Sequence, residues 1–547
     1  MCSFWVRSSV FCDINSAVAS ASAYLERHDR ACAVAVLCLA AFNLTFRLGS
    51  EFVTEWDESL YANSAWEAVH NGNWIGTTFM GALDYYNTKP PLNVWLIALS
   101  FKAFGVSLIS LRAASTLSAF LTVLVLQIWA RKCFGSLVAL LSSLVLSTTF
   151  GFFYVHSGRS ANTDAPYTLF MLLTVVTLWA ETRRPWLRVW LGPLLAATFL
   201  LRGMAVLMPL ALVVVVLVMR RGRKAVEDAA PGLTEGPRRG AITWLPTLVA
   251  IVLSVAPVAA WAIARFRVDR WRFFERMIMY DFVSRSVESL EGHGGGPLYY
   301  LNILQKHQYD WLLVAVVAWL VFPVPWPQLR GMLSRERDPG GLRRLLAAWA
   351  GVTLVIPTLM LTKTPWYLNP FYPLFALCVG IIIARSLSLS TSPVVSRRRL
   401  QVLSGVLLAM LVLAETKMLW YSFSFRDVNL SDQGLILAER RQLTGQRLCR
   451  NRQSRAAIFV ATAVVGAEML QTEELAEFLR DSRPGDYLLC TNPCDSPELH
   501  LVRTNGQYFL YRRRGRGGRS EQRLIRGGLE HSLTSSRTIE GKGRGQP

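Results

Sequence analysis

The sequence predicts a mainly α-helical, polytopic membrane protein with about eleven transmembrane helices and a small carboxy-terminal α/β extracytoplasmic domain. Two observations lead to this prediction. The chain of 547 residues is 52% hydrophobic and only 17% charged, whereas soluble domains carry roughly a quarter charged residues. Apolar runs long enough to cross a bilayer also alternate with short basic clusters along most of the chain.

The predicted spans follow these apolar runs in order. Roughly twenty apolar residues cross a bilayer, and shorter runs can do so inside a packed bundle. The first run follows Arg27 and Arg30 and is interpreted as a signal anchor. Spans are expected at approximately residues 31–48, 111–130, 136–156, 165–181, 187–202, 204–219, 244–264, 309–327, 345–361, 366–386 and 400–421.

Basic clusters assign the two sides of the membrane. Cytoplasmic loops carry an excess of Lys and Arg, and one orientation, with the amino terminus inside, places every basic cluster on that side. The clusters lie before residue 31, at 131–132, 183–184, 220–224, 330–344 and 397–399. The loops at 49–90, 157–164, 265–308 and 362–365 are then external.

Residues 91–105 form an apolar segment that is too short for an ordinary span. If this segment crossed the membrane, Arg131 and Lys132 would move outside and Asp57 would lie opposite Asp164. A short interfacial or half-embedded helix that begins at Pro90-Pro91 avoids both problems. We therefore expect residues 49–110 to form one external loop region.

The chain is expected to divide into four parts. A cytoplasmic segment (1–30) precedes the transmembrane domain (31–421), an external α/β domain (422–511) follows, and a disordered basic tail (512–547) ends the chain. In the α/β domain, strands are predicted at 458–465, 486–491 and 507–511, with a helix near 473–480.

The net charge of +21 does not indicate nucleic-acid binding, because Lys and Arg cluster beside the apolar runs. The Arg/Gly tract after Arg512 is similar to RNA-binding tails, but contact with anionic lipid headgroups explains it equally well. Four of the nine cysteines, Cys32, Cys38, Cys133 and Cys378, lie in or beside apolar runs and are interpreted as core residues. A disulfide can form only among Cys449, Cys490 and Cys494.

Polar residues that could carry chemistry collect on the external face. Each has a plain structural alternative: Asp57 and Glu58 as loop charges, Asp164 as a helix cap, Lys89 and Lys363 as snorkelling side chains. Ionisable groups near a bilayer are costly and usually functional, so their convergence indicates a site. The candidates are Asp57, Glu58, Tyr86, Lys89, Asp164, Arg202, Arg285, His293, Lys363 and Tyr367.

Several of these residues stand in motifs that occur in one order. Asp57-Glu58 precedes Tyr61-Ala62, Gly72-Asn73-Trp74 and Lys89-Pro90-Pro91, and the segments from Thr163 to Pro166 and from Lys363 to Pro370 follow. This pattern resembles the GT-C glycosyltransferases, and more narrowly the aminoarabinose transferase and protein O-mannosyltransferase group. That group uses polyprenyl-phosphate sugars. The resemblance covers roughly residues 30–390 and implies a GT-C fold.

The resemblance implies an integral-membrane glycosyltransferase that moves a sugar from a polyprenyl-phosphate donor to an acceptor hydroxyl, with inversion. Asp57 would be the general base, with Glu58 beside it and Asp164 orienting the acceptor or the catalytic loop. Positive charge and a hydroxyl donor would stabilise the departing phosphate. The donor-binding residues would be Lys89, Lys363, Tyr367, Arg202, Arg285, Tyr86 and His293.

Two positions depart from the family pattern. Thr88 stands where the family often has an acidic residue, which removes a potential metal ligand, so no metal site is predicted and a divalent ion stays an open alternative. Arg202-Gly203 replaces the family's frequent Lys-Gly and keeps the cation. No Gly-rich nucleotide loop is present in the sequence, in agreement with a lipid-linked donor.

Two alternatives from other classes stay open. A lipid or sugar transporter or flippase would also place charges in a membrane cavity, but internal repeats and broken midplane helices are typical of that class. A structural partner in an envelope assembly is the other. The sugar is open, and the acceptor could be a glycan, a lipid or a protein. The resemblance favours a bacterial inner membrane with the site on its external face.

Overall fold

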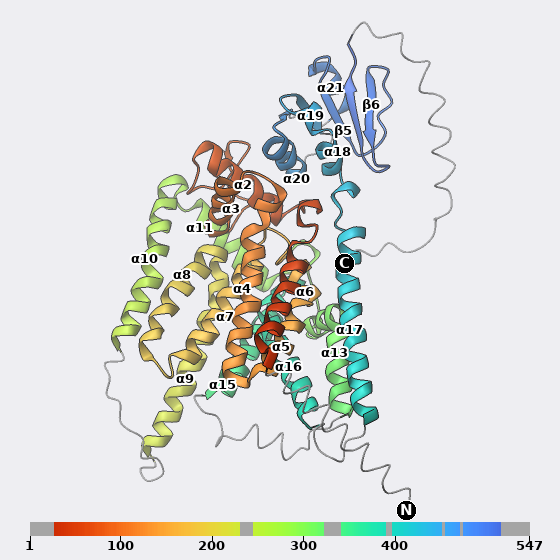
Figure 1. The fold of residues 1–547 in the computed structure, drawn as a ribbon. Coiled ribbons are helices and arrows are strands. Elements are labelled where there is room, and N and C mark those ends of the chain that lie inside the picture. The colour runs from red at the N-terminus through yellow and green to blue at the C-terminus, as the bar shows by residue number, and fades with distance from the viewer. Residues whose placement is uncertain are drawn as a thin grey trace, which may run out of the picture. The chain divides into compact units, whose positions relative to one another are not determined.

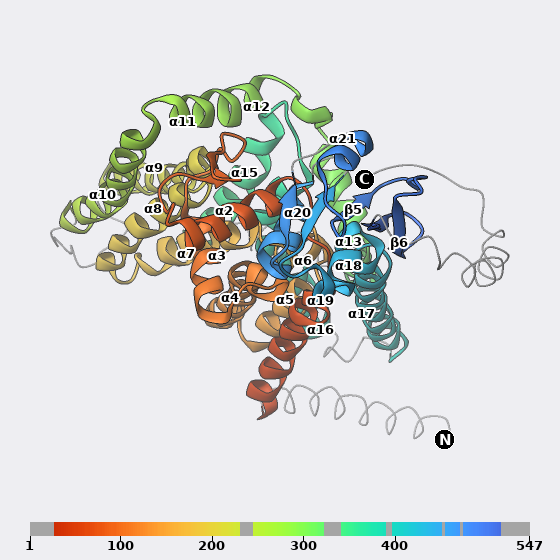
Figure 2. The same ribbon diagram turned by 90° about the horizontal axis from the view of Figure 1, so that it is seen from above.

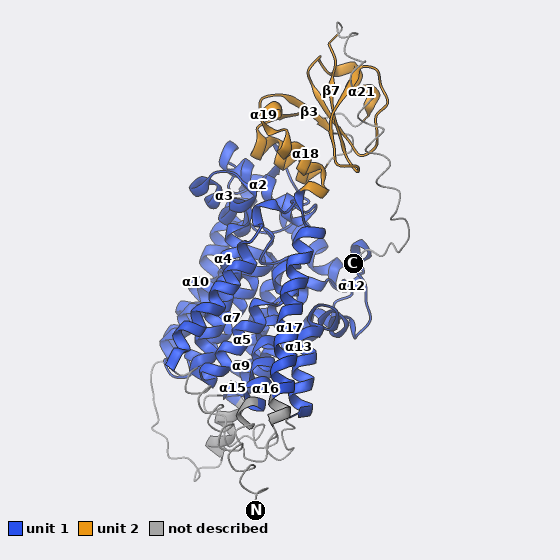
Figure 3. Ribbon diagram, turned by 45° about the vertical axis from the view of Figure 1, so that its right-hand side comes forward, with its two compact units in different colours: residues 1–428 blue, residues 429–547 orange. Residues whose placement is uncertain are grey.

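The computed structural model describes residues 27–229, 244–321, 341–389, 397–450, 454–470 and 474–515. The chain divides into two compact units, residues 1–428 and 429–547 (Figure 3). The predicted amino-terminal segment up to residue 26, and the basic tail from residue 516, lie outside the described residues.

The first unit is a bundle of apolar helices (Figure 1). Each expected span overlaps a helix of this unit, although the span 136–156 is interrupted after Ser147 and the span 309–327 continues beyond the described residues. These helices are Arg27–Ser50, α4 (Leu108–Phe134), α5 (Ser136–Ser147), α7 (Asp164–Ala180), α8 (Leu191–Arg202), α9 (Leu207–Ala229), α10 (Trp244–Asp269), α13 (Tyr299–Val321), α15 (Leu342–Leu359), α16 (Tyr372–Leu389) and α17 (Arg397–Ser424).

Within the described ranges, seven helical stretches are long and apolar enough to cross a membrane. Two expected spans join in one of them, Pro185–Arg221, which is interrupted by a 3₁₀ turn where Gly203 has a φ of 58°. The others are Arg27–Ser50, Leu108–Phe134, Trp244–Asp269, Leu342–Leu359, Pro365–Ser386 and Gln401–Ser424. Length and composition of these stretches are those of an integral membrane protein.

Large aromatic side chains fill the centre of this bundle. Trp129, Trp311 and Trp349 are fully buried. The indole N–H of Trp311 donates to Thr148 Oγ1 at 2.9 Å, and that of Trp349 donates to the Pro370 carbonyl at 3.1 Å. Buried indoles need such partners, so these contacts fix how the neighbouring helices meet.

Small residues allow two helix pairs to approach closely. A Cβ added at Gly192 of α8 would lie 2.2 Å from the carbonyl oxygen of Ala250 in α10. A Cβ at Gly380 of α16 would lie 2.3 Å from the hydroxyl oxygen of Ser142 in α5. Close backbone approach through small residues is typical of helices packed in membranes.

Short elements cover one end of the bundle. α2 (Asp57–Asn71) leads into the hairpin β1 (Thr78–Phe79) and β2 (Ala82–Leu83), followed by α3 (Leu92–Phe104). Seen from above, α2 lies over the bundle rather than at its edge (Figure 2). α3 follows Pro90-Pro91, has 13 residues and packs against α2 and α4. A helix of this length fits the expected short segment better than a full span.

A second connection contributes to the same end. Between α10 and α13 the chain forms α11 (Arg272–Glu275), a π-helical segment, η4 (Arg276–Ser284), and α12 (Arg285–Val287). A further short helix, α6 (Phe150–Tyr154), precedes the segment that leads to α7, and η8 (Pro365–Phe371) precedes α16. π-Helical turns are rare and frequently occur at functional sites.

The second unit contains a five-stranded mixed sheet in the order β4-β3-β5-β7-β6. β3 pairs in parallel with β4 and β5, whereas β7 is antiparallel to β5 and β6. The strands are β3 (Arg447–Arg450), β4 (Glu468–Leu470), β5 (Tyr487–Cys490), β6 (Leu499–Thr504) and β7 (Phe509–Arg513). The helices are α18 (Asp432–Ala438), α19 (Arg440–Leu443), α20 (Arg455–Phe459) and α21 (Leu475–Asp481).

One predicted strand of this unit is wrong. Residues 458–465 belong to α20 and a following π-helical turn, Val460–Val465. Ser454 caps the helix by accepting from the Ala457 amide at 3.1 Å, and Gly466 ends it with a φ of 78°. A short apolar run is compatible with either a buried helix or a buried strand. Here the Ser454 cap favours the helix.

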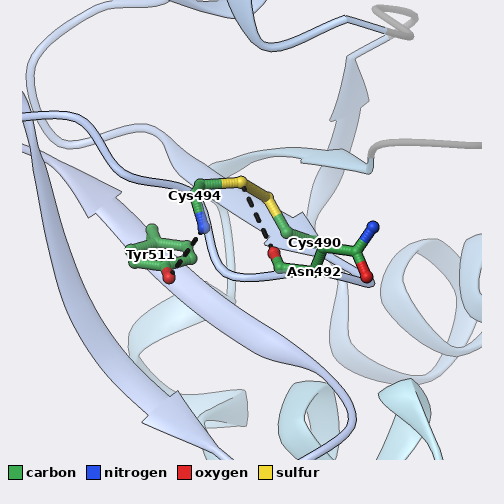
Figure 4. Close-up of a disulfide and its surroundings, with 4 residues drawn as sticks. All are labelled: Cys490, Asn492, Cys494 and Tyr511. Atoms are coloured by element: carbon green, nitrogen blue, oxygen red, sulfur yellow. Dashed lines mark hydrogen bonds between the residues drawn. A yellow bond between two sulfur atoms is a disulfide. The ribbon is translucent and has the colours of Figure 1, made fainter.

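The predicted strands at 486–491 and 507–511 correspond to β5 and β7, and the predicted helix to α21. A disulfide joins Cys490, at the end of β5, to Cys494 (Figure 4). The Cys494 amide donates to the Tyr511 hydroxyl at 3.0 Å, which holds this turn against β7. Cys449 is buried and is not part of this disulfide.

Candidate active site

A cavity of about 610 Å³ lies in the first unit, where the short elements meet the bundle. Several separate parts of the chain line it: the start of α2, the turn before α3, the segment before α7, the break between α8 and α9, η4 with α12, the loop that carries Glu291 and His293, the end of α15, and η8. Its polar lining includes Asp57, Tyr86, Lys89, His156, Arg202, Arg276, Tyr280, Asp281, Arg285, Glu291, His293 and Tyr367.

Asp57 is the first residue of α2 and faces this cavity with a side chain that is 40% exposed. The preceding residue, Trp56, has a φ of 68°, a conformation that non-glycine residues adopt rarely. This turn starts the helix sharply, and the carboxylate in the first turn is favoured by the helix dipole. The local backbone therefore presents the Asp57 side chain to the cavity.

His156 lies beside that carboxylate, with Nδ1 3.9 Å from Asp57 Oδ2. Its ring stacks on Trp366 at 3.9 Å between centroids, and Nδ1 lies 3.0 Å from the Asn162 amide nitrogen. Burial lowers the pKa of His156 below the usual histidine range, although Asp57 and Asp164 oppose the shift. With the Asn162 amide as the donor, Nδ1 is the acceptor of this hydrogen bond.

His156→Phe is expected to lower the turnover number about tenfold at pH 7 while leaving donor KM unchanged. Phenylalanine keeps the stacking on Trp366 but removes the ring nitrogen beside Asp57. Steady-state kinetics of the purified variant test this. His156→Asn, which restores a polar group but not the ring, distinguishes the nitrogen from the stack. An unchanged turnover number in His156→Phe would contradict a role for the nitrogen.

Besides Arg276, three cations line the cavity from different elements. Lys89 pairs with Asp281, and Arg285 Nε lies 3.4 Å from Asp281 Oδ1. Arg285 also contacts Glu291 at 3.3 Å, and the Tyr280 hydroxyl donates to Glu291 Oε1 at 2.6 Å. Residues far apart in the sequence thus form one charged wall.

Arg202 supplies the third cation from the break between α8 and α9. Its guanidinium forms an ion pair with Asp164 and lies 5.6 Å from the Tyr367 ring centroid and 5.3 Å from that of Tyr167. Asp164 is buried and, among the described residues, is not part of the cavity lining. It therefore fixes Arg202 rather than facing the cavity itself.

Glu58 points away from the cavity into the protein. Its side chain is fully buried, and its carboxylate accepts from Arg112 Nε at 2.8 Å, the Thr54 amide at 2.8 Å and the Ala161 amide at 3.1 Å. Burial alone would raise the pKa of Glu58, but Arg112 and Arg426 lower it to about 2. The two neighbouring carboxylates thus have different surroundings: Asp57 faces the cavity and Glu58 anchors the start of α2.

Lys363 also lies outside the cavity lining, as far as the described residues show. Its ammonium donates to the Met360 carbonyl, and its backbone amide donates to the His293 carbonyl at 2.9 Å. It thereby joins the Gly-rich loop to the start of η8. Tyr86, His293 and Tyr367, the other predicted donor-binding residues, do line the cavity.

Sequence comparison connects this geometry to known proteins. Residues 88–261 match the family model of dolichyl-phosphate-mannose-protein mannosyltransferases. The chain is 30% identical over 344 residues to an undecaprenyl phosphate-α-4-amino-4-deoxy-L-arabinose arabinosyl transferase of Pseudomonas savastanoi, covering 61% of this chain and 58% of that protein. A protein of the same name from Pseudomonas aeruginosa is 28% identical over 395 residues, covering 69% and 64%. The chain thus spans about three fifths of these relatives.

Structure comparison covers more of the chain. The crystal structure of ArnT from Cupriavidus metallidurans bound to undecaprenyl phosphate matches with a TM-score of 0.60 at 14% identity, covering 87% of this chain and 97% of that one. Its apo structure matches with a TM-score of 0.61 at 16% identity. The chain thus has the fold of ArnT, which is the GT-C fold that its sequence motifs resemble. The fold that the sequence pattern implied is thereby confirmed.

Within this GT-C fold, sequence reasoning missed His156, Asp281 and Glu291. His156 is a polar residue at the end of an apolar stretch, and this position could have marked it in the sequence as a candidate site residue. Asp281 is the acidic residue of an otherwise basic and apolar segment, but its pairing with Lys89 depends on the tertiary fold. Glu291 stood beside the singled-out His293 and has a φ of 55°.

No grouping of three or more His, Cys, Asp or Glu side chains fit to hold a metal occurs among the described residues. Thr88 lines the cavity at the position where the GT-C pattern often has an acid. His293 packs edge-on against Trp366, with 5.8 Å between ring centroids. These residues do not fit a divalent ion, so no step of the reaction is assigned to a metal.

Proposed function

We propose that this GT-C protein transfers a sugar from a polyprenyl-phosphate donor to an acceptor hydroxyl, with inversion at the anomeric carbon. The names of its relatives make undecaprenyl phosphate-linked 4-amino-4-deoxy-L-arabinose the first donor to test. The acceptor is a glycan, a lipid or a protein, and no nucleic acid takes part.

One observation carries the proposal: a single cavity has a carboxylate on one wall and cations on another. Asp57 supplies this carboxylate from the start of α2, whereas Lys89 and Arg285 come from other elements and contact Asp281. Another part of the cavity lining is apolar and suits an isoprenyl chain that enters from the bilayer. It consists of Met204, Leu207 and Met208 beside α9 and of Ile356, Leu359 and Met360 from the end of α15.

The proposed reaction is a direct displacement. Asp57 takes the proton of the acceptor hydroxyl as that oxygen attacks the anomeric carbon. The bond between this carbon and the phosphate oxygen breaks, and polyprenyl phosphate leaves with the electron pair. Attack from the face opposite the phosphate gives inversion.

Fixed positive charge would lower the energy of this step, because negative charge grows on the departing phosphate. Lys89, Arg285 and Arg202 supply that charge, and Tyr367 donates from its hydroxyl. Asp164 positions Arg202, Glu58 positions Asp57, and Lys363 positions the loop that carries His293. Tyr86 and His293 are assigned to the sugar side of the donor because they line the same cavity.

We place the reaction on the external face of a bacterial inner membrane. The basic clusters support this orientation, and so does the disulfide between Cys490 and Cys494, because disulfides persist in oxidising compartments. In this arrangement residues 31–421 form the catalytic domain with its external loop 49–110, and residues 422–511 form an external domain.

Intact cells are expected to show this orientation directly. A membrane-impermeant maleimide should label Cys494 only after a reductant is added. The readout is Cys494, because Cys490 is buried. Cys133, which lies at the opposite end of α4 from the short elements, should not be labelled. Mass spectrometry of the labelled peptides gives the result, and lysed cells serve as the control for reactivity. Labelling without reductant would contradict the oxidised pair, and no labelling before lysis would contradict the external placement.

The function itself is tested by release of free polyprenyl phosphate from purified protein in nanodiscs. A panel of polyprenyl-phosphate sugars is offered with mixed envelope acceptors, and wild type is compared with Asp57→Asn. Release by the wild type alone supports the transferase and names the donor. Donor binding without release in any combination would favour a transporter or flippase.

A further inference from the structure

The two cations that we assign to the donor phosphate already share an anionic partner. Lys89 contacts both carboxylate oxygens of Asp281, and Arg285 Nε lies 3.4 Å from Oδ1 of the same side chain. Lys89 comes from the turn before α3 and Arg285 from the start of α12. Asp281 is thus the point at which these two distant segments meet.

Asp281 resembles the proposed ligand in charge and shape. A carboxylate carries one negative charge over two oxygens, as does the pair of non-bridging oxygens of a phosphodiester. The Asp281 side chain is 9% exposed and lines the cavity, so it lies where the donor phosphate would need to be. Both anions cannot hold the same two cations at once.

The contact with Arg285 is incomplete. Arg285 Nε is buried and makes no hydrogen bond within the described part of the chain, because Asp281 reaches it only at ion-pair distance. A buried donor left without a hydrogen bond is costly. A tetrahedral phosphate carries more acceptor oxygens than a carboxylate and can satisfy this donor together with Lys89.

Asp281 also stands on backbone that can change. It lies within η4, the π-helical segment Arg276–Ser284. In the same segment, the side chains of Ile278 and Met279 are 40% and 54% exposed. Conversion of a π-helical turn to α-helical pairing would rotate the side chains that follow it.

We infer that Asp281 occupies the phosphate position of the empty cavity and is displaced when the donor binds. This inference rests on the proposed function, since it takes the phosphate of a polyprenyl-phosphate donor as the ligand. Asp281 is therefore a residue that limits donor affinity. Neutral lipids gain nothing from displacing it, and only an anion recovers both cations, so it also contributes to selectivity.

The opposite role is that Asp281 holds Lys89 and Arg285 in place for the phosphate. The two roles differ in the sign of one measurement. If Asp281 occupies the position, its removal strengthens phosphate binding. If it only positions the cations, its removal weakens binding.

The test is the dissociation constant of farnesyl phosphate for the purified full-length chain in nanodiscs. We expect Asp281→Asn and Asp281→Ala to bind about tenfold more tightly than wild type, because one charge-assisted competitor is lost. Glu291→Gln is the matched control. It removes a carboxylate that contacts Arg285 but not Lys89, so its effect should be smaller. Weaker binding by both Asp281 variants would overturn the inference.

Two further measurements separate this inference from the function on which it rests. Lys89→Gln should weaken farnesyl phosphate binding in wild type and in the Asp281→Asn background. If Lys89→Gln has no effect, the phosphate does not bind at these cations and the proposed function fails with the inference. Farnesol, which lacks the phosphate, should bind wild type and Asp281→Asn equally, and a gain for farnesol would count against displacement.

Discussion

Asp57→Asn is expected to lower the rate of sugar transfer by about 10²- to 10⁴-fold, the contribution typical of a general base. Asparagine has nearly the same size and polarity but cannot take the proton of the acceptor hydroxyl. Because the Asp57 side chain is 40% exposed and outside the buried ion pairs of Glu58, the fold should persist. The turnover number should therefore fall while the thermal stability stays unchanged.

The measurement is the turnover number for release of polyprenyl phosphate, together with the dissociation constant of the donor. Donor affinity should change little, because the phosphate is assigned to cations on another wall of the cavity. Glu55→Gln is the matched control: it removes an exposed carboxylate two positions away that does not line the cavity. If Asp57→Asn keeps more than a tenth of wild-type turnover, another group is the base.

Arg112→Ala is expected to destabilise the protein by about 3–5 kcal/mol, the cost of breaking a buried ion pair from one side. Arg112 is fully buried in α4. Besides Glu58, it donates to the carbonyls of Leu48 at 2.7 Å, Glu51 at 3.0 Å and Phe52 at 2.8 Å. Alanine leaves a buried carboxylate and three carbonyls without this donor. The melting temperature of the purified protein in detergent should fall accordingly.

Arg131→Ala, at the far end of the same helix, is the control for Arg112→Ala. Arg131 pairs with Asp29 through a side chain that is 49% exposed, and exposed pairs contribute about 0–1 kcal/mol. The double variant Glu58→Gln/Arg112→Met should lose less stability than the sum of its single changes, because neither charge is then left alone. Equal losses of stability in Arg112→Ala and Arg131→Ala would contradict a stabilising role of the buried Glu58–Arg112 ion pair.

The stability that the Glu58–Arg112 ion pair contributes is also expected to depend on pH. The pKa of Glu58 is lowered in the folded protein from 4.5 to about 2. A lowered carboxyl pKa stabilises the fold at any pH above 4.5, and this contribution is lost as the pH falls from about 4.5 toward 2. The difference in melting temperature between wild type and Glu58→Gln should therefore shrink below pH 4.5.

Patterns along the chain predict the apolar helices and the central strand β5 because these depend on local periodicity and length. They do not separate Asp57 from Glu58. The first turn of α2 directs one carboxylate to the cavity and the other to Arg112, which lies more than fifty residues further along. Which of two adjacent acids is buried is decided by this tertiary contact.

The role of Lys363 shows the same limit of sequence information. A motif places it near the phosphate, whereas its ammonium bonds the Met360 carbonyl. Asp281 is the opposite case. No motif marks this acid in a long connection, and its importance becomes visible only in the folded chain, where Lys89 pairs with it. The residues of a motif indicate the site, and the contacts between motifs decide what each residue does there.

Arg426 follows the end of α17 and lies three positions before the second unit begins. Its guanidinium approaches Glu51 at 3.5 Å and Glu58 at 3.8 Å, and its carbonyl accepts from the Phe52 amide at 3.0 Å. Shortened versions of the protein should therefore differ abruptly in behaviour according to where they stop. A chain that stops after Val428 keeps the counter-ion of both buried acids, whereas one that stops at Ser424 loses it.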